Sequence, residues 1–469
     1  MKFASLDEFI EDATERMEQG DETFRTLDIT NPVAENHLEG EDSRFSDDID
    51  ESLENEMIIQ LLNTARTSGH LINDLFLGFF QIDHEISLAL VQLFQDENRS
   101  WKRLAIQRCP GRVLESCLSI VATRDHLESL CLYQNNLGYT GFSCLAMILA
   151  SNSAKLVTLD LEDYISPNSA DALAAGLKVN STLRTLDLCY CRFDRDALEY
   201  ITMGISQHSQ LRTLLLTNCE LTDMNAAFMI NALVDHPSLR RIDLGLNYCC
   251  VKSMKALASA VRDDRMPKLE SISLAHQCKR LDPRLAIPLP VGMVGGPLES
   301  NTVLKEISFS NNYLHPAELD FLMHGVKESR LEKLHLARCG ISDKGLQSLL
   351  LKLPNSLRML DLTENLFANE ESNTALLAAV ERHEDLENLK IDRDLDCWIQ
   401  VCYQCRLNRG GRRIFTCKKT VPLSLWPRIL ERANLTDWST YDPQDEGKGF
   451  PEDVIYHVLK GPAFCGRLS

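Results

Sequence analysis

Leu183-Arg-Thr-Leu-Asp-Leu-Cys-Tyr-Cys191 is one copy of a phrase that recurs through most of the 469-residue chain. Its apolar residues stand at positions i, i+3 and i+5, and Asn or Cys follows at i+8. Because Leu186 and Leu188 lie two residues apart, they point to the same side of a strand, while Thr185 and Asp187 point to the other. The phrase therefore predicts a short, half-buried β-strand that ends in a turn at Cys191.

The residues after this turn predict a helix. Leu198, Ile201 and Ile205 follow the spacing of three and four that gives a helix one apolar face. The phrase returns every 26 to 35 residues, so each copy has room for one strand, one turn and one helix. Twelve copies begin at Ile72, Trp101, Leu127, Leu156, Leu183, Leu211, Leu239, Leu269, Leu304, Leu331, Leu357 and Leu386. One copy cannot bury its own apolar side, but stacked copies can, which predicts a curved α/β solenoid with a concave parallel β-sheet and convex helices.

The quoted phrase and Leu357-Arg-Met-Leu-Asp-Leu-Thr-Glu-Asn365 resemble the ribonuclease-inhibitor type of leucine-rich repeat. The resemblance covers about residues 72–394 and implies a horseshoe-shaped solenoid of about 12 repeats, in a class whose members mostly bind other proteins. Four turn positions depart from the pattern: Phe80, Tyr164, Gln277 and Asp394. The resemblance implies no reaction, because function on such a scaffold resides in the surface it presents.

Composition divides the chain into three segments. Residues 1–56 carry 19 Asp or Glu against 4 Lys or Arg, which predicts a disordered acidic tail. An alternative there is a short helix over residues 5–17, because Leu6, Ile10, Ala13 and Met17 share one helical face. Residues 57–396 are predicted to form the solenoid, with a helix over 57–71 closing its N-terminal end. Residues 397–469 hold three of the four tryptophans and predict a C-terminal cap or small helical module.

The C-terminal segment contains a second resemblance. The phrases Leu407-Asn-Arg-Gly-Gly-Arg-Arg413, Val421-Pro-Leu-Ser-Leu-Trp-Pro-Arg-Ile-Leu-Glu-Arg-Ala-Asn434 and Asp453-Val-Ile-Tyr-His-Val-Leu-Lys-Gly-Pro462 resemble the ending of uncharacterised microalgal leucine-rich-repeat proteins. This resemblance supplies no activity. The same segment has a basic run from Arg406 to Lys419, which predicts a solvated surface or a dock for the acidic tail, with anion binding as an alternative.

Four cysteines near the end of the solenoid leave one alternative open. Cys397, Cys402, Cys405 and Cys417 provide the number of thiolates that a structural zinc site needs. Only one CxxC pair is present, however, and the apolar neighbours favour thiols that are buried as small apolar groups. No metal or cofactor is predicted.

Charge and hydropathy exclude several classes of protein. The net charge is -19, and -15 of it lies in residues 1–56, so the solenoid lacks the broad basic surface that nucleic acid requires. No run of about 18 apolar residues predicts a membrane helix, and the acidic start lacks a signal-peptide core. Cysteines at the turn positions fit a reducing compartment, so we expect a cytoplasmic protein, with the nucleus as an alternative. No phosphate-binding glycine loop, serine elbow or metal-spaced histidine pair predicts an enzyme.

The outward positions i+2, i+4 and i+6 of the strands form the predicted binding surface. They are acidic and polar near the middle, which favours a protein partner with a basic or mixed face. A simpler interpretation is that Asp at i+4 only keeps this face soluble. The candidate partner-binding residues are Phe76, Tyr133, Asp160, Glu162, Asp187, Leu215, Asp243 and Glu306.

The sequence therefore predicts a non-catalytic intracellular scaffold that binds a protein on the concave face. One alternative is a ubiquitin-ligase substrate adaptor that docks a ligase subunit through helices near residues 421–433. Another is a regulator of a small GTPase, because Ran GTPase-activating proteins resemble this fold and carry an acidic tail.

Overall fold

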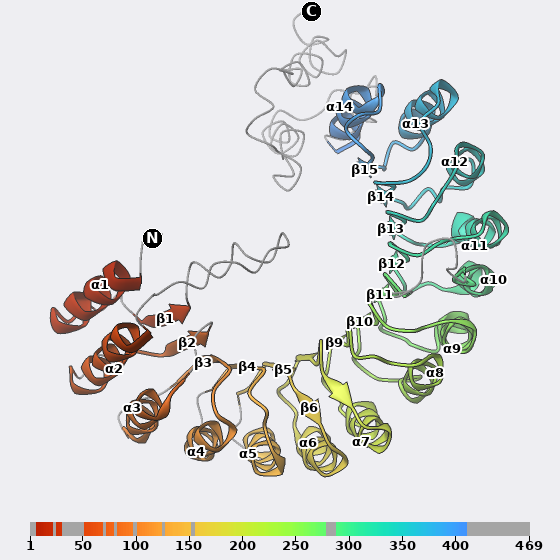
Figure 1. The fold of residues 1–469 in the computed structure, drawn as a ribbon. Coiled ribbons are helices and arrows are strands. Elements are labelled where there is room, and N and C mark those ends of the chain that lie inside the picture. Colours follow the sequence, from red (N-terminus) through yellow and green to blue (C-terminus); the bar gives the residue numbers. More distant parts are fainter. Residues whose placement is uncertain are drawn as a thin grey trace, which may run out of the picture. The chain divides into compact units, whose positions relative to one another are not determined.

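The computed structural model describes residues 6–21, 25–30, 51–68, 72–78, 82–96, 101–123, 127–151, 155–277 and 288–409. Over these ranges the chain alternates between short strands and helices (Figure 1). No helix in these ranges combines the length and the apolar character that crossing a membrane requires.

The strands build a parallel sheet in which each strand lies beside the strand of the next repeat. In the described ranges this sheet has 13 strands, in the order β1 (Thr26–Thr30), β2 (Asp74–Gly78), β3 (Arg103–Gln107), β4 (Ser129–Tyr133), β5 (Thr158–Glu162), β7 (Thr185–Asp187), β9 (Thr213–Leu215), β10 (Arg241–Asp243), β11 (Ser271–Ser273), β12 (Glu306–Ser308), β13 (Lys333–His335), β14 (Met359–Asp361) and β15 (Asn388–Lys390). Two further strands, β6 (Tyr164–Ile165) and β8 (Arg192–Phe193), pair with each other in a separate small sheet.

One helix accompanies each strand of the large sheet. The helices are α1 (Leu6–Glu18), α2 (Glu51–Thr67), α3 (His84–Gln95), α4 (Gly111–Val121), α5 (Tyr139–Ala150), α6 (Pro167–Val179), α7 (Arg195–Ser206), α8 (Asp223–Ala232), α9 (Val251–Val261), α10 (Gly292–Ser300), α11 (Pro316–Glu328), α12 (Asp343–Leu350), α13 (Glu370–Arg382) and α14 (Trp398–Arg409), with a 3-10 turn at Arg262–Asp264. Figure 1 shows them along one side of the strands. We call the other side of the strands, where no described helix lies, the open face.

The described residues fall into two compact units. The first unit contains the residues up to Glu220 together with His236–Arg241, and the second contains Leu221–Asp235 and the residues from Ile242 onward.

The core of each repeat consists of the leucines that the phrase predicts. Leu183, Leu186 and Leu188 are 0 % exposed, and so are Ala197 and Ile201 of α7, which pack from the helix side. Leu186 lies between the equivalent leucines of the neighbouring repeats, because the parallel pairing keeps the repeats in register. Each such leucine contributes roughly 1.5–3 kcal/mol through burial, and within each unit the stacked rows form an apolar interior.

Most strands of the repeats are followed by a residue with left-handed backbone geometry, at position i+7. Tyr190 has φ 61° and Asn218 has φ 60° in the first unit, and Leu246 has φ 54° in the second. This conformation turns the amide of residue i+7 toward the next repeat, where Tyr190 N donates to Thr217 O at 2.8 Å and Leu246 N donates to Ala275 O at 2.9 Å. Hydrogen bonds between repeats therefore continue past the end of the strands.

Position i+8, the turn slot, links each repeat to the one before it. Asn247 accepts from Leu221 N at 3.0 Å and donates to Leu244 O at 3.0 Å. Asn312 Nδ2 donates to a carbonyl of the repeat before it, Leu274 O, at 2.8 Å, and cysteine donates a weaker bond to the equivalent carbonyl, as Cys219 Sγ does to Leu188 O at 3.0 Å. Gln277, one of the four departures, accepts from Cys249 N and donates to Leu244 O, so its longer amide satisfies the same kinds of backbone group.

A second set of buried polar side chains organises the loop before several of the strands. Asn180 Oδ1 accepts from the amides of Thr182 and Leu183 at 2.9 and 2.8 Å. In the next repeat His208 Nδ1 accepts from Gln210 N and Leu211 N at 3.2 and 3.0 Å. Since both amides donate to Nδ1, the imidazole must be neutral, and burial lowers the pKa of His208 to about 4.

The prediction of disorder over residues 1–56 is wrong for the part of that segment that the structure describes. Residues 6–18 form α1, which packs against α2 and buries Ile10, Ala13 and Met17. Residues 26–30 form β1, which pairs with β2 and buries Leu27 and Ile29. The burial of these five side chains opposes the entropy of ordering, and acidic composition alone does not reveal it.

The helix expected over residues 57–71 is present as α2, but it does not close the solenoid, because α1 and β1 lie beyond it. At the other end α14 covers α13 and β15, and Asn408 Nδ2 donates to the carbonyls of Val380, His383 and Leu386. Residues 410–469 of the expected C-terminal module, including the helices near residues 421–433, lie outside the described residues, and so does the turn position Phe80.

Candidate partner-binding surface

Three carboxylates gather on the open face of the first unit. Asp160 on β5 lies opposite Asp187 on β7, and Glu162 follows Asp160 two residues later on the same side of β5. We call Asp160, Glu162 and Asp187 the acidic row. The parallel register places these outward side chains together, because position i+4 of one repeat always meets position i+4 of the next.

Neighbouring side chains hold the acidic row in place. The hydroxyl of Tyr133 donates to Asp160 Oδ2, and Gln134 Nε2 donates to Glu162 Oε1 at 2.7 Å. Asp187 accepts from the amide of Cys189 at 2.9 Å. Within the described residues none of the three carboxylates has an ion pair with Lys, Arg or His.

Burial and like charge make the charged form of Asp160 costly. The pKa of Asp160 is raised to about 6: burial is the main cause, the hydrogen bond from Tyr133 opposes it, and the nearby charges of Asp187 and Glu162 add to it. Burial is also the main reason that the pKa of Tyr133 lies above its usual value. Tyr133 therefore stays a neutral donor at physiological pH.

Two other predicted residues lie on this unit, one near the row and one apart from it. Leu215 on β9 is opposite Asp187, so an apolar side chain borders the acidic row. Phe76 lies on β2, where the guanidinium of Arg103 stands 5.8 Å from its ring centre and also pairs with Asp74 at 2.6 Å. Phe76 is thus part of a separate cluster.

Asp243 and Glu306 have their own local partners. Asp243 accepts from Gly245 N at 2.9 Å. Glu306 lies 3.3 Å from His335 Nε2 and 3.2 Å from Lys333 Nζ, and the hydrogen bond from His335 is the largest of the contacts that lower its pKa to about 2. Glu306 is therefore already neutralised by its neighbours, unlike the acidic row.

The fourth repeat breaks the turn pattern and opens a pocket at the edge of the sheet. Its i+7 residue, Asp163, is not among the left-handed residues, and the chain runs on into β6 instead of turning. Asp163 takes over the role of the slot residue, because its carboxylate accepts from Leu137 N at 2.6 Å. Tyr164, which occupies the slot by sequence, is displaced outward and is 50 % exposed.

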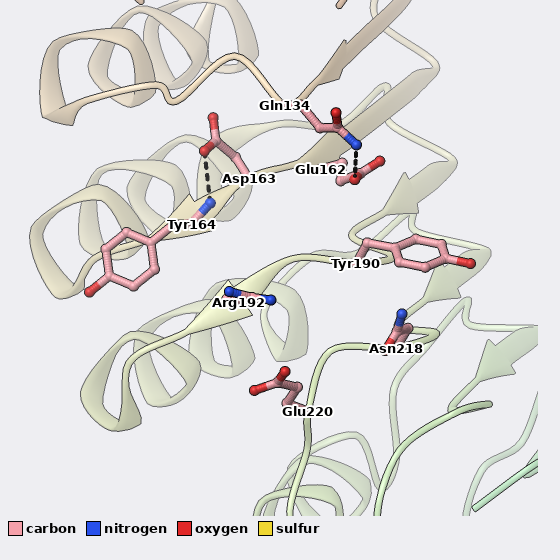
Figure 2. A pocket seen from close by; sticks show the side chains of 8 residues that line it. All are labelled: Gln134, Glu162, Asp163, Tyr164, Tyr190, Arg192, Asn218 and Glu220. Atoms are coloured by element: carbon pink, nitrogen blue, oxygen red, sulfur yellow. Dashed lines mark hydrogen bonds between the residues drawn. The ribbon is translucent and has the colours of Figure 1, made fainter. Parts of the chain in front are cut away.

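This pocket, which we call the edge pocket, has a volume of about 320 Å³ and lies in the first unit (Figure 2). Figure 2 shows Tyr164 and Tyr190 at its two ends, with Arg192 between them and Glu220 nearby. It is lined by Gln134, Glu162, Asp163, Tyr164, Tyr190, Arg192, Asn218 and Glu220. Glu162 also belongs to the acidic row, so the pocket and the row are continuous.

Sequence reasoning identified Glu162 but missed the other residues of the edge pocket. It considered only the outward positions of the strands, whereas Gln134, Tyr190 and Asn218 stand at i+7, and Arg192 and Glu220 stand one residue after the slot. The departure at Tyr164 was the available signal, because a broken repeat rule marks a place where the backbone takes another path.

The three described cysteines of the possible zinc set lie on or next to α14. Burial raises the pKa of Cys397 to about 11 and that of Cys405 to about 12, which disfavours thiolates there. Among the described residues no three His, Cys, Asp or Glu side chains are arranged to hold a metal ion. Cys417 lies outside these residues.

No family model matches the chain. No curated protein matches it either. Two solved structures have a similar chain path. The TLR13–ssRNA13 complex is 16% identical, with a TM-score of 0.39, and the match covers 68% of this chain and 39% of that one. An internalin (inlF) from Listeria monocytogenes str. 4b F2365 is 15% identical, with a TM-score of 0.39, and the match covers 72% of this chain and 83% of that one. The chain thus spans 39% of the length of the first of them.

The fold itself is evident from the chain's own repeats: one strand and one helix per repeat, parallel strands in sequence order, and leucines at i, i+3 and i+5 in the core. It is a leucine-rich-repeat solenoid.

Proposed function

We propose that the protein is a non-catalytic scaffold that binds a protein partner with a basic or mixed surface on the open face of the first unit. The acidic row carries this proposal. Its three carboxylates lie together without a cationic partner among the described residues, and the pKa of Asp160 is raised chiefly by burial and in part by the charges of Asp187 and Glu162. A basic partner would offset the repulsion between these carboxylates, so the surface favours association with cations.

The surroundings of the row support a binding role. The open face carries no described helix, and the strands beneath it are joined through the buried leucines and the turn slots, such as Asn135 and Cys191. Leu215 and Tyr133 add apolar and aromatic area beside the charges, which is the mixture that interface anchors need. We further propose that the repeats are of the ribonuclease-inhibitor type, since each strand is followed by a full helix, and that the protein works in a reducing, intracellular compartment that keeps its buried thiols free.

The test is affinity capture from a native extract with two charge-reversal variants. One variant combines Asp160→Lys, Glu162→Lys and Asp187→Lys. The matched control combines Asp171→Lys, Asp196→Lys and Glu199→Lys, three exposed carboxylates on α6 and α7 of the same unit. The proposal predicts that proteins captured by the wild type and by the control are lost from the first variant, and that added salt releases them, because exposed charges are screened over about 10 Å at 0.1 M. An unchanged set of captured proteins would contradict it.

No observation on the described residues favours either alternative function. The segment 421–433 that a ligase adaptor would use lies outside them, and they offer no residue positioned to act on GTP. Both remain predictions, which truncation after Leu395 and a GTP-hydrolysis assay with purified GTPases would test.

A further inference from the structure

We infer that the edge pocket receives an arginine side chain of the same partner that lies along the acidic row. This inference rests on the proposed function and specifies which side chain anchors the partner. The pocket adjoins the row through Glu162, so a chain crossing the open face at β5 and β7 passes its mouth.

The charge of the pocket selects for a cation. Glu162, Asp163 and Glu220 face a single guanidinium, that of Arg192, so the lining is net negative. No ion pair joins Arg192 to any carboxylate of the described residues, and no described side chain or amide donates to the carboxylate of Glu220. The negative charge is therefore available to a ligand and is not used up in local pairs.

Asp163 places a carboxylate where the neighbouring repeats have neutral side chains, such as Asn135 and Cys191. Its Oδ2 accepts from Leu137 N at 2.6 Å and its Oδ1 from Tyr164 N at 2.7 Å, so the carboxylate is fixed at the pocket by the backbone. Burial raises the pKa of Asp163, so its charge is held at a cost that a bound cation would reduce.

The walls of the pocket suit the shape of a guanidinium. Tyr164 and Tyr190 are 50 % and 52 % exposed and offer aromatic rings, on which the flat guanidinium packs with a cation–π attraction. Its five N–H groups match several acceptors at once, here the carboxylate oxygens of Glu162, Asp163 and Glu220. A volume of about 320 Å³ leaves room for one such side chain beside Arg192.

The test measures binding of two labelled peptides to the full-length protein by fluorescence anisotropy at low salt. One peptide is acetyl-Gly-Arg-Gly-Arg-Gly-amide, and the other replaces arginine with the isosteric, neutral citrulline. We expect the arginine peptide to bind about tenfold more tightly, because charge-assisted hydrogen bonds and complementary charge are lost with citrulline. Equal binding of the two peptides, or no binding of either at millimolar concentration, would overturn the inference.

Two single variants determine the sign of the charge that the pocket selects. Glu220→Gln should weaken binding of the arginine peptide by about threefold, and Arg192→Gln should tighten it by a similar factor, since each changes one exposed charge. Glu199→Gln on α7 is the matched control and should change nothing. The opposite pair of effects would identify an anion site, and Tyr190→Ala without any effect would exclude the aromatic wall.

These results are separable from failure of the proposed function. A captured partner can be lost on charge reversal of Asp160, Glu162 and Asp187 and still bind equally well to Glu220→Gln, Arg192→Gln and Tyr190→Ala. That result would support the scaffold proposal and contradict the arginine pocket. If the peptide binds as described but no protein is captured on the open face, the scaffold proposal falls while the pocket remains.

Discussion

Asn247 joins two repeats through one fully buried amide, so its removal tests how the solenoid is held together. Asn247→Ala leaves Leu221 N without its acceptor and removes one of the two donors to Leu244 O, which keeps its bond from Gln277, and we expect it to lower the free energy of unfolding by about 1–3 kcal/mol. Asn247→Cys should cost only about 1 kcal/mol, because cysteine already fills this slot in other repeats, where its thiol donates a weak bond to a carbonyl of the repeat before it. Urea unfolding of the three proteins measures the difference. Equal losses of stability in the Ala and Cys variants would show that the side chain at this position contributes only packing volume and no hydrogen bond.

His208 makes stability depend on pH in a direction that its contacts fix. Its folded pKa of about 4 lies below the value of about 6.5 for an unfolded histidine, so the unfolded chain binds the proton more readily. Neutral, buried His208 therefore makes its full contribution to the free energy of unfolding above about pH 6.5. This contribution is lost as the pH falls toward 4, and the loss is about 2 kcal/mol at pH 5. His208→Asn, which copies Asn180, should keep the two amide bonds and flatten this part of the pH profile, as measured by urea midpoints between pH 8 and 5. A variant with the same slope as the wild type would contradict the assignment.

At the residue scale the sequence predicts the core residues better than the residues of the edge pocket. The leucine spacing identifies Leu186 and Leu188 because burial alone places apolar side chains at i+3 and i+5. Tyr164 could be recognised as a departure but not interpreted. Its exposure depends on Asp163 accepting from Leu137, a contact between repeats that no local pattern encodes.

At the scale of single elements, the main surprise is the extra repeat at the N-terminus. Arg25-Thr-Leu-Asp28 repeats the letters of Arg184-Thr-Leu-Asp187, and the structure makes a strand of both. The acidic surroundings concealed this match, because composition averages over a segment whereas strand formation needs only Leu27 and Ile29 to meet β2.

We predict that β1 and α1 are protected against hydrogen exchange and that Leu27→Ala removes this protection. Leu27 is 0 % exposed, so replacing its side chain with that of alanine should destabilise the terminal repeat by about 2–4 kcal/mol. The exposed Glu11→Ala on α1 is the control and should leave the exchange pattern unchanged. Exchange at the unprotected rate for residues 25–30 in the wild type would instead support the disordered tail that composition predicts.

At the scale of the whole molecule, the repeat fixes the architecture and leaves function to the surface. The spacing of the leucines predicts parallel strands in sequence order, and the outward positions that follow from it bring Asp160, Glu162 and Asp187 together as expected. The leucine spacing did not predict that Glu306 pairs with His335 and Lys333, because side-chain pairing across strands depends on the rotamers of three residues in two repeats. The domain division at residues 56 and 396 remains a prediction.

The most direct test of the central claim is site-specific photo-crosslinking of the captured partner. A photoreactive phenylalanine analogue at Thr185 lies on β7 beside the acidic row, and the same analogue at Lys178 lies on α6, on the helix side of the same unit. Binding on the open face predicts crosslinks to the partner from position 185 and none from position 178. Crosslinks from position 178 alone would place the partner on the helices and contradict the account.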